Sequence, residues 1–229
     1  MSSIKAAKVQ VGVSPDPAHN FVLDASLADG TMTIDRTTDP VQTVFKVNAD
    51  GTVELPVNGA IITYRAQLLP VATISGTFLT IGGIPSWTKR ISVMFDHVLS
   101  STTSDMIVQI GTATGIETTG YESVSMMSVA GSGGAGANAT TGFIIAKNVA
   151  TYNIVGQLQI TLADETSRLW IASGATGTVS VSAAGASAGT KIMDNPGPIT
   201  QVKITTVSGA SIFSGTTANQ IAILCEGGW

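Results

Sequence analysis

Charged side chains are scarce in this chain, and their scarcity limits what it can do. Asp, Glu, Lys and Arg make up 11% of the 229 residues, and the chain has 2 His, 1 Cys and 5% aromatic residues. Soluble domains usually carry about 25% charged residues. We therefore expect small hydroxyl side chains and backbone to cover the surface. Most enzymes need converging charged groups, so we predict a structural or binding protein that is not an enzyme.

The single cysteine, Cys225, excludes an intrachain disulfide and a zinc cluster. It lies in an apolar run, and a free cysteine is usually buried, so we expect a buried thiol. The formal net charge is -4, and no basic cluster could attract a phosphate backbone. The segment MSSIKAAKVQVG has no continuous apolar stretch, and no run reaches the roughly 18 apolar residues of a membrane span. We predict no nucleic acid partner, no secretory signal and no membrane insertion.

Two motifs that bind ligands in other proteins are incomplete here. Gly131–Gly134 lacks the Lys-Ser/Thr pair and the following helix of a phosphate-binding loop. Asn48–Gly51 resembles half of a calcium loop, but Lys46 occupies a ligand position and no Glu closes the site. A tight turn explains Asn48–Gly51 better. We therefore predict no cofactor and no metal.

Apolar residues alternate with polar ones in almost every run. Leu158, Ile160 and Leu162 share one face of such a run, and Ile91, Val93 and Phe95 share a face of another. Alternation with many β-branched residues is typical of half-buried antiparallel strands, and turn residues separate the runs. No segment shows helical periodicity. The chain is predicted to be all-β.

Residues 1–62 differ from the remainder by their Asp content and their short candidate strands. Phe21 and Phe45 are the aromatic residues of this segment. So small a piece with so few large apolar groups cannot bury enough surface alone. We predict that other copies of the chain stabilise it in an intertwined oligomer. Its expected strands are Lys8–Val13, Phe21–Asp24, Thr31–Ile34, Thr43–Val47 and Thr52–Leu55.

Residues 63–229 are predicted to form a jelly-roll-like antiparallel β-sandwich. Trp87, Phe95, Trp170 and Phe213 are the expected large core side chains, and a position at the rim is the alternative for Trp87. The glycine- and alanine-rich stretches Ala130–Thr141 and Ser182–Thr190 are predicted to be mobile loops. The expected strands are Ile61–Ala66, Thr73–Ile81, Ile91–Val98, Met106–Gly111, Glu122–Val129, Gly142–Lys147, Tyr152–Leu162, Leu169–Ser173, Thr178–Ser182, Ile199–Val207 and Ile221–Glu226.

Residue types of a catalytic triad occur together at Asp96, His97, Ser100 and Ser101. A triad needs its members to converge in space, and neighbours along a strand point to opposite faces. We therefore expect Asp96 and His97 to point apart. Asp164-Glu165 is interpreted as a solvated hairpin turn rather than as a carboxylate pair.

Four residues are predicted to contact a ligand. Glu117 and Glu122 flank Tyr121 in a Gly/Thr-rich loop, and Asn138 lies in the second loop of this kind. An aromatic ring with nearby acceptors and hydroxyls can stack on a sugar and form hydrogen bonds with it. The same residues also suit an ordinary loop, and the sequence leaves both interpretations open.

Three groups of segments are informative when taken together. They are Val9–Gly12, Asn20–Ala25, Ala28–Met32 and Phe45–Val53; Ile84–Ile91 and Gly115–Tyr121; and Val202–Val207 through Phe213 to Ile221–Leu224. The first group is similar to the N-terminal segments of virion proteins of tailed bacteriophages, the second resembles the C-terminal β domains of tail fibres, and the third resembles the closing strand pair of those domains. Glu226 is followed by Gly227-Gly228-Trp229, whereas such C-termini often close on an acidic residue.

The resemblance implies a homotrimeric virion component that assembles in the cytoplasm of a bacterial host. Residues 1–62 would attach it to another virion protein of the tail, baseplate or capsid, and residues 63–229 would form a knob. One hypothesis is a short tail fibre or receptor-binding protein whose knob loops contact a glycan or protein of the host surface. The predicted receptor contacts are then Glu117, Tyr121, Glu122 and Asn138. The alternative is a decoration, cement or head-fibre protein that stabilises the capsid. A depolymerase is disfavoured by the shortage of acidic pairs and histidines.

Overall fold

A computed structural model describes residues 8–11, 21–24, 32–36, 42–47, 53–57, 60–73, 76–99, 103–131, 133–146, 153–178, 182–208 and 220–228. Backbone contacts divide the chain into two compact units, residues 1–65 with 227–229 and residues 66–226. The division lies close to the boundary predicted after residue 62. The attachment and knob functions of the two parts stay predictions.

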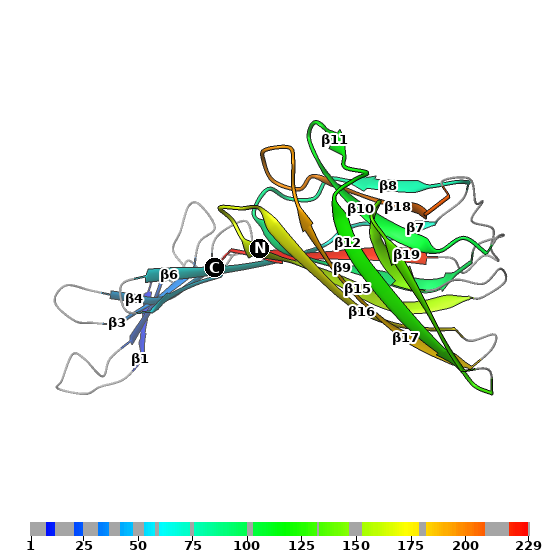
Figure 1. The fold of residues 1–229 in the computed structure, drawn as a ribbon. Coiled ribbons are helices and arrows are strands. Elements are labelled where there is room, and N and C mark those ends of the chain that lie inside the picture. Colours follow the sequence, from blue (N-terminus) through cyan, green and yellow to red (C-terminus); the bar gives the residue numbers. More distant parts are fainter. Residues whose placement is uncertain are drawn as a thin grey trace. The chain divides into compact units, whose positions relative to one another are not determined.

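The first unit is an antiparallel meander in which each strand pairs with the next along the chain. Its strands correspond to those predicted, with shifted ends, and the described part forms one sheet layer (Figure 1). A single layer has no second layer against which to bury a face. The strands are β1 (Lys8–Val11), β2 (Phe21–Asp24), β3 (Met32–Arg36), β4 (Gln42–Val47), β5 (Val53–Val57) and β6 (Ala60–Leu68).

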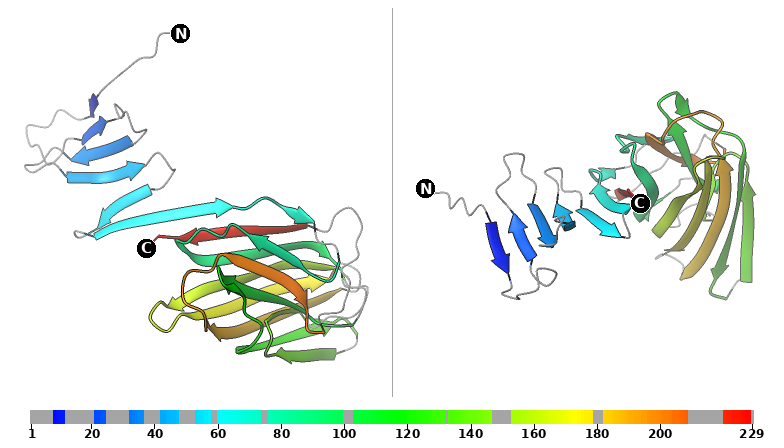
Figure 2. Two further views of the ribbon diagram at one scale, coloured as in Figure 1. Left: turned by 90° about the horizontal axis from the view of Figure 1, so that it is seen from above. Right: turned by 90° about the vertical axis from the view of Figure 1, so that its left-hand side faces the viewer.

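The second unit is a sandwich of a large and a small β-sheet (Figures 1 and 2). The large sheet has the order β19-β9-β15-β16-β17-β12-β13, with β7 beside β19; the small one has the order β11-β10-β18-β8, with β14 beside β10. The bounds are β7 (Ala72–Thr73), β8 (Leu79–Gly82), β9 (Thr88–Val98), β10 (Met106–Thr112), β11 (Gly115–Ile116), β12 (Tyr121–Val129), β13 (Gly133–Ala139), β14 (Phe143–Ala146), β15 (Ile154–Asp164), β16 (Leu169–Thr178), β17 (Ala183–Ile192), β18 (Gln201–Thr206) and β19 (Gln220–Gly227).

The all-β prediction is confirmed, as is the antiparallel sandwich. Every strand pair whose register is described is antiparallel. The jelly-roll connectivity stays a prediction. The part of the chain that the structure describes also contains no helix capable of crossing a membrane.

The hydrophobic core lies between the two sheets. Phe95 and Trp170 are buried there as predicted, and Trp87 is half-buried against the core, at its margin. Cys225 is fully buried on β19, which confirms the expected buried thiol, and burial raises the pKa of that thiol. Phe213 lies outside the described residues.

The two stretches predicted as mobile loops form strands β13 and β17, so that prediction is wrong. Strand β17 is hydrogen-bonded to β16 along one edge and to β12 along the other. Glycine and alanine contribute little side-chain packing, but their backbone groups satisfy a sheet ladder as well as those of any residue. Neighbouring strands, rather than local propensity, hold these segments in the sheet.

Several predicted strands of the second unit have different limits, and two of the predictions differ most from the structure. The run 73–81 is divided between β7 and β8. Thr178 ends β16, Ser182 lies in a turn with a φ of 48°, and residues 179–181 of the remaining prediction lie outside the described residues.

Gly156 on β15 occupies a backbone position that excludes a side chain. Its φ is +128°, and a Cβ there would lie 2.4 Å from the carbonyl oxygen of Ala175 and 2.8 Å from Cα of Thr176. We predict that Gly156→Ala lowers the free energy of unfolding by about 3 kcal/mol, because it combines backbone strain with a backbone clash. Urea unfolding of the purified protein measures the loss.

Gly136→Ala is the matched control, because a Cβ at Gly136 would meet Ser125 O at an ordinary 3.5 Å. We expect this variant to stay within about 1 kcal/mol of the wild type. Equal stability of the two variants would contradict the close approach at Gly156.

Candidate functional site

Strand β12 turns apolar side chains toward solvent and hydroxyls toward the interior. Val124 and Met126 are 56% and 67% exposed, whereas Ser123 and Ser125 are buried. A sheet that covers a core on one face normally shows the opposite order. The large sheet therefore has an apolar outer face, on which the exposed large side chains are Val124, Met126, Ile171 and Ile192.

The strands beside β12 carry the smallest side chains. Met126 lies opposite Gly136 on β13 and Ala186 on β17, and Ala186 in turn lies opposite Ala175 on β16. A hydrogen or a methyl group at these positions leaves space beside the larger side chains of β12. A hollow forms for this reason along the outer face.

This hollow, called the outer groove below, extends over β12, β13, β16 and β17 from Glu122 to Met126. It consists of two adjoining parts of about 500 and 510 Å³ that share Val124 and Ala188. Such volumes lie within the range of small-ligand sites, and the opening is broad. The groove is therefore a surface for contact rather than an enclosed chamber.

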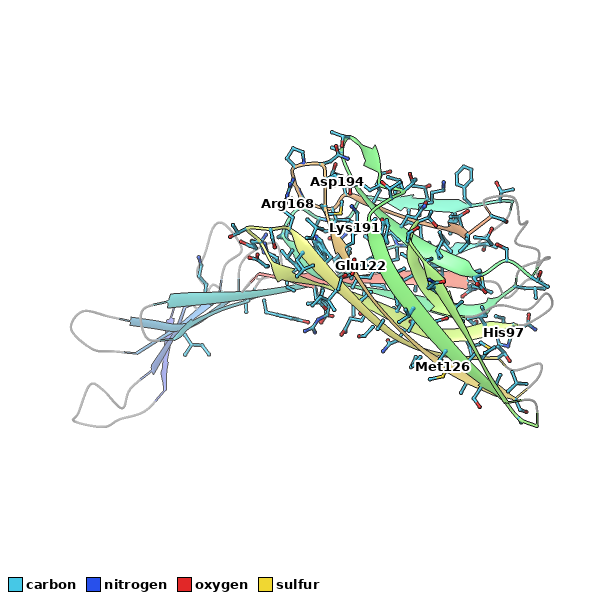
Figure 3. The ribbon with its side chains drawn as sticks, in the orientation of Figure 1. His97, Glu122, Met126, Arg168, Lys191 and Asp194 are labelled. Atoms are coloured by element: carbon cyan, nitrogen blue, oxygen red, sulfur yellow. The ribbon has the colours of Figure 1, made fainter. Side chains whose placement is uncertain are left out.

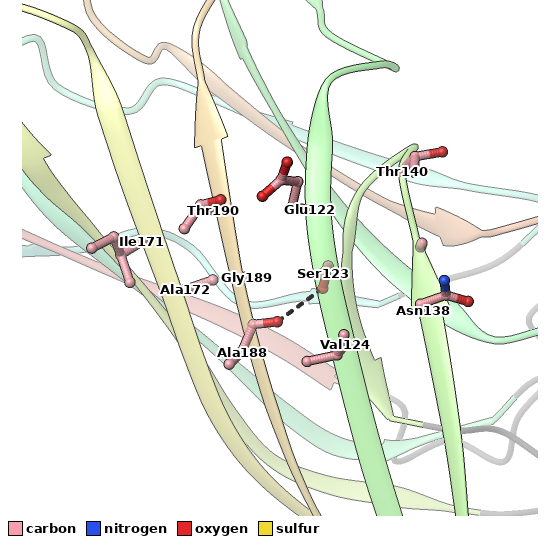
Figure 4. Close-up of a pocket in the computed structure, with 11 residues that line it drawn as sticks. Glu122, Ser123, Val124, Asn138, Thr140, Ile171, Ala172, Ala188, Gly189 and Thr190 are labelled. Atoms are coloured by element: carbon pink, nitrogen blue, oxygen red, sulfur yellow. Dashed lines mark hydrogen bonds between the residues drawn. The ribbon is translucent and has the colours of Figure 1, made fainter.

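One end of the outer groove is polar. Glu122 on β12 lies opposite Thr190 on β17, Thr140 borders the same end, and Asn138 on β13 lies opposite Val124 (Figure 4). The Ser123 hydroxyl donates to the carbonyl of Ala188 at 3.3 Å beneath the surface. A carboxylate, an amide and two hydroxyls beside an apolar floor can orient a ligand that has both kinds of surface. Among the described lining residues Glu122 is the one charged group.

Tyr121 was predicted to contact a receptor, but its ring is buried, so this prediction is wrong. The residue is 1% exposed, and its ring meets Phe143 edge-on at 5.0 Å between centroids. Its hydroxyl accepts from the Ile110 N–H at 2.9 Å and donates to the Glu117 carbonyl at 3.0 Å. Burial raises the pKa of Tyr121 above its ordinary value. Side chains alternate along β12, so Tyr121 points to the same interior side as Ser123 and Ser125.

Glu117 is also buried, which corrects its predicted role as a surface contact. One carboxylate oxygen lies 2.7 Å from Nζ of Lys191, whose side chain is fully buried. The carboxylate also accepts from the N–H groups of Asp194 at 3.0 Å and Asn195 at 2.7 Å. Burial would raise the Glu117 pKa, but Lys191 and these N–H donors outweigh it and hold the pKa below its ordinary value.

The Lys191 ammonium has an acceptor for each of its three protons. Besides Glu117 it meets Asp194 Oδ2 at 3.0 Å and the Ile192 carbonyl at 2.6 Å. Figure 3 shows Lys191 and Asp194 at the same end of the sandwich. We use the name buried ion cluster for the buried Glu117 and Lys191 together with Asp194, whose side chain is 72% exposed and borders the pair at the surface. The cluster connects the end of β17 to the chain just before β12.

Glu122 and Asn138 are exposed and line the outer groove, and their predicted contact with a receptor stays a prediction. Sequence reasoning missed Val124, Met126, Ile171 and the alanines of β17. The alternation of β12 shows two series, Tyr-Ser-Ser-Met-Val and Glu-Val-Met-Ser, and each contains large apolar residues. That ambiguity was the available signal, because a strand with two comparable faces has something to cover on each.

Asp96 and His97 were expected to point apart, and this is wrong. His97 Nδ1 lies 2.6 Å from Asp96 Oδ1. His97 has a left-handed backbone with a φ of 53°, which interrupts the alternation of β9. Both side chains are substantially exposed, and Ser100 and Ser101 lie outside the described residues. Asp164 and Glu165 lie in the β15–β16 hairpin as predicted.

Across the described ranges, no three His, Cys, Asp or Glu side chains gather closely enough to hold a metal ion. The outer groove offers one carboxylate and no histidine or cysteine in its described lining. The groups that line the groove can form hydrogen bonds and apolar contacts with a bound partner.

The comparisons with known proteins assign no family. No family model and no curated protein matches this chain. A solved structure, the infectious bursal disease virus VP2 subviral particle, aligns at 8% identity and a TM-score of 0.13 over 93% of this chain and 54% of that one. The chain thus spans about half the length of that structure. A likeness this weak carries no argument about fold or function.

The buried ion cluster makes stability depend on pH. Because the Glu117 pKa is lowered from 4.5 by folding, its stabilisation is complete above that value and is lost as the pH falls through the lowered pKa. We predict that Glu117→Gln lowers the free energy of unfolding by about 3 kcal/mol at neutral pH, because the Lys191 charge stays buried. Below pH of about 4.5 the difference from the wild type should shrink. Denaturant unfolding over a pH series measures both effects.

Glu122→Gln is the control, because it makes the same change at an exposed position on the next strand. We expect that variant to follow the wild type at every pH, within about 0.5 kcal/mol. A pH-independent loss in Glu117→Gln would contradict a lowered Glu117 pKa.

Proposed function

We propose that this chain is a non-enzymatic virion structural protein, a trimeric short tail fibre or receptor-binding protein. The observation that carries the proposal is the outer groove with the exposed apolar side chains around it. Val124, Met126 and Ile171 are each more than two-fifths exposed on one face. Contiguous apolar surface on a soluble protein usually marks a contact site. The polar end of the outer groove can form hydrogen bonds that fix the orientation of a bound partner.

The distribution of titratable groups supports a binding role over catalysis. Glu117 and Lys191 form an ion pair inside the sandwich, so their charges are not available in the outer groove. Asp96 and His97 are paired at the surface, away from the outer groove. A general acid and base must converge on one substrate position. The groove supplies a single carboxylate, so we propose no reaction there.

The architecture of the first unit supports the proposed oligomer. Its described strands form one antiparallel layer. A sheet becomes stable when at least one of its faces packs on another layer. Copies of the same unit would supply those layers in a trimer, and the trimer would present three outer grooves. Several weak contacts then act together through avidity.

A second candidate function is capsid decoration, and the chemistry of the groove favours it in one respect. The exposed residues Val124, Met126 and Ile192 are aliphatic, and the described lining contains no aromatic ring. Sugar-binding surfaces commonly use aromatic faces, whereas a flat aliphatic patch suits a protein interface. In this case the groove would cover a capsid subunit instead of a host receptor.

Charge placed in the outer groove tests the proposal. We predict that Val124→Glu and Met126→Glu each weaken binding of the purified protein by at least about tenfold, because a carboxylate would be desolvated in the contact. Both positions are exposed, so the fold should tolerate the change. Binding is measured on susceptible bacteria and on empty capsids of the same phage.

Thr80→Glu adds the same charge at an exposed position on β8 of the small sheet and serves as the matched control. Loss of cell binding in the groove variants alone supports reception, and loss of capsid binding alone supports decoration. Unchanged binding in both assays, or an equal loss of binding in Thr80→Glu, would show that the outer groove is not the binding surface.

The proposed trimer is tested by the mass of the particle in solution. Light scattering during size exclusion should give three times the chain mass of 23.3 kDa over a wide dilution range. We expect the trimer to persist on dilution, because the first unit buries its sheet only in the assembly. A stable monomer with native far-ultraviolet circular dichroism would contradict the oligomer and the role assigned to residues 1–62.

A further inference from the structure

A second cavity lies at the end of the sandwich, apart from the outer groove. It has a volume of about 300 Å³ and is bordered by the start of β9, the β15–β16 hairpin and the turn at Gly197-Pro198. Leu162, Trp170 and Pro198 give it an apolar wall. Two strands and a proline turn hold this wall in place. The volume is at the lower end of the range of small-ligand sites and suits a single sugar ring.

The cavity contains more positive than negative charge. Lys89, Arg168 and Glu165 line it, and Lys89 Nζ donates to a carboxylate oxygen of Glu165. The guanidinium of Arg168 makes no ion pair or hydrogen bond with any residue that the structure describes. Arg168 is half-buried and lines the cavity, so its guanidinium donors are free for a ligand there. In a chain with a net charge of -4, this is a local excess of positive charge.

The backbone at Arg168 is a position for which glycine is better suited. Its φ is 56°, at the end of the β15–β16 turn. The Asp164 carboxylate accepts from the N–H groups of Thr166 at 3.0 Å and Ser167 at 3.1 Å, and the Arg168 carbonyl accepts from Met193 N–H at 3.2 Å. These bonds hold Arg168 in the left-handed region, which non-glycine residues seldom occupy. Strain of this kind gathers at ligand sites.

We propose that this cavity binds an acidic sugar through a carboxylate or phosphate group on the ring. The Arg168 guanidinium can meet the two oxygens of such a group with two parallel N–H donors. Lys89 adds a second positive charge, and the Ser86 hydroxyl lies on the border of the cavity. The apolar wall covers the C–H face of the ring. The inference goes beyond the proposed function and does not rest on it, because the outer groove has no part in it.

Isothermal titration of the full-length protein tests the proposal with four probes: glucuronate, N-acetylneuraminate, glucose 6-phosphate and neutral glucose. We expect at least one acidic sugar to bind about tenfold more tightly than glucose, with affinity falling as salt is added. The carboxylate and phosphate probes decide which anionic group the cavity prefers. Added inorganic phosphate should compete for the same site.

Arg168→Gly is the decisive variant, because it removes the guanidinium and also relieves the left-handed backbone. It should fold at least as stably as the wild type and bind the acidic sugar at least about tenfold more weakly. Arg168→Lys should bind with intermediate affinity, since an ammonium keeps the charge without the paired donors. Lys203→Gln removes one positive charge from β18, away from the cavity, and should bind as the wild type does.

Binding of an acidic sugar that is lost in Arg168→Gly and kept in Lys203→Gln and Met126→Glu establishes the site, whatever the fate of the outer groove. Failure of all three acidic sugars to bind, equal affinity for neutral glucose, or unchanged affinity in Arg168→Gly would each overturn it.

Discussion

The backbone ladder that holds β17 between β16 and β12 is the constraint on which the outer face depends. Residues 183–189 of β17, which lie close to the neighbouring strands, are all glycine, alanine or serine. A Cβ at Gly185 would lie 2.7 Å from the Met126 carbonyl, and one at Gly189 would lie 2.8 Å from the Glu122 carbonyl. With so little side-chain packing available, hydrogen bonds along both edges keep this strand in register. The small outward residues of β17 then create the outer groove.

The buried ion cluster fixes the end of the same strand. Lys191 is the penultimate residue of β17, and Glu117 precedes β12. Burying two opposite charges costs desolvation that their attraction offsets only with good geometry, so the pair contributes more to position than to net stability. The three acceptors around Lys191 and the two N–H donors on Glu117 supply that geometry. A chain with few charges thus uses some of them where water is excluded.

The two candidate binding surfaces have different chemistry. The outer groove is broad and aliphatic, with one carboxylate at its polar end. The cavity at the β15–β16 hairpin is smaller, and it is lined by Arg168, whose guanidinium has no partner among the residues that the structure describes. The first suits a large partner surface, and the second suits a small anionic group. In the proposed trimer each would occur three times, and individually weak contacts would reinforce one another.

Some residues of the candidate site could be predicted from the sequence, and others could not. Glu122 and Asn138 could be selected as surface polar groups, because each follows the local pattern of its strand or turn. Tyr121 and Glu117 could not be placed, since an aromatic ring beside carboxylates in a Gly/Thr-rich stretch looks the same whether buried or exposed. The sequence does not single out Arg168, because its left-handed backbone arises only when Asp164 closes the hairpin turn.

The sequence alone determined the all-β class, the positions of most strands and the burial of Phe95, Trp170 and Cys225. It could do so because alternation with a period of two is a local property that the chain carries in every fold it could adopt. Which face of β12 turned inward, and that AAGASAGTKI became a central strand, were decided by the tertiary structure. Those outcomes depend on partners distant in sequence, β16 for β17 and Lys191 for Glu117, whose pairing no local pattern encodes.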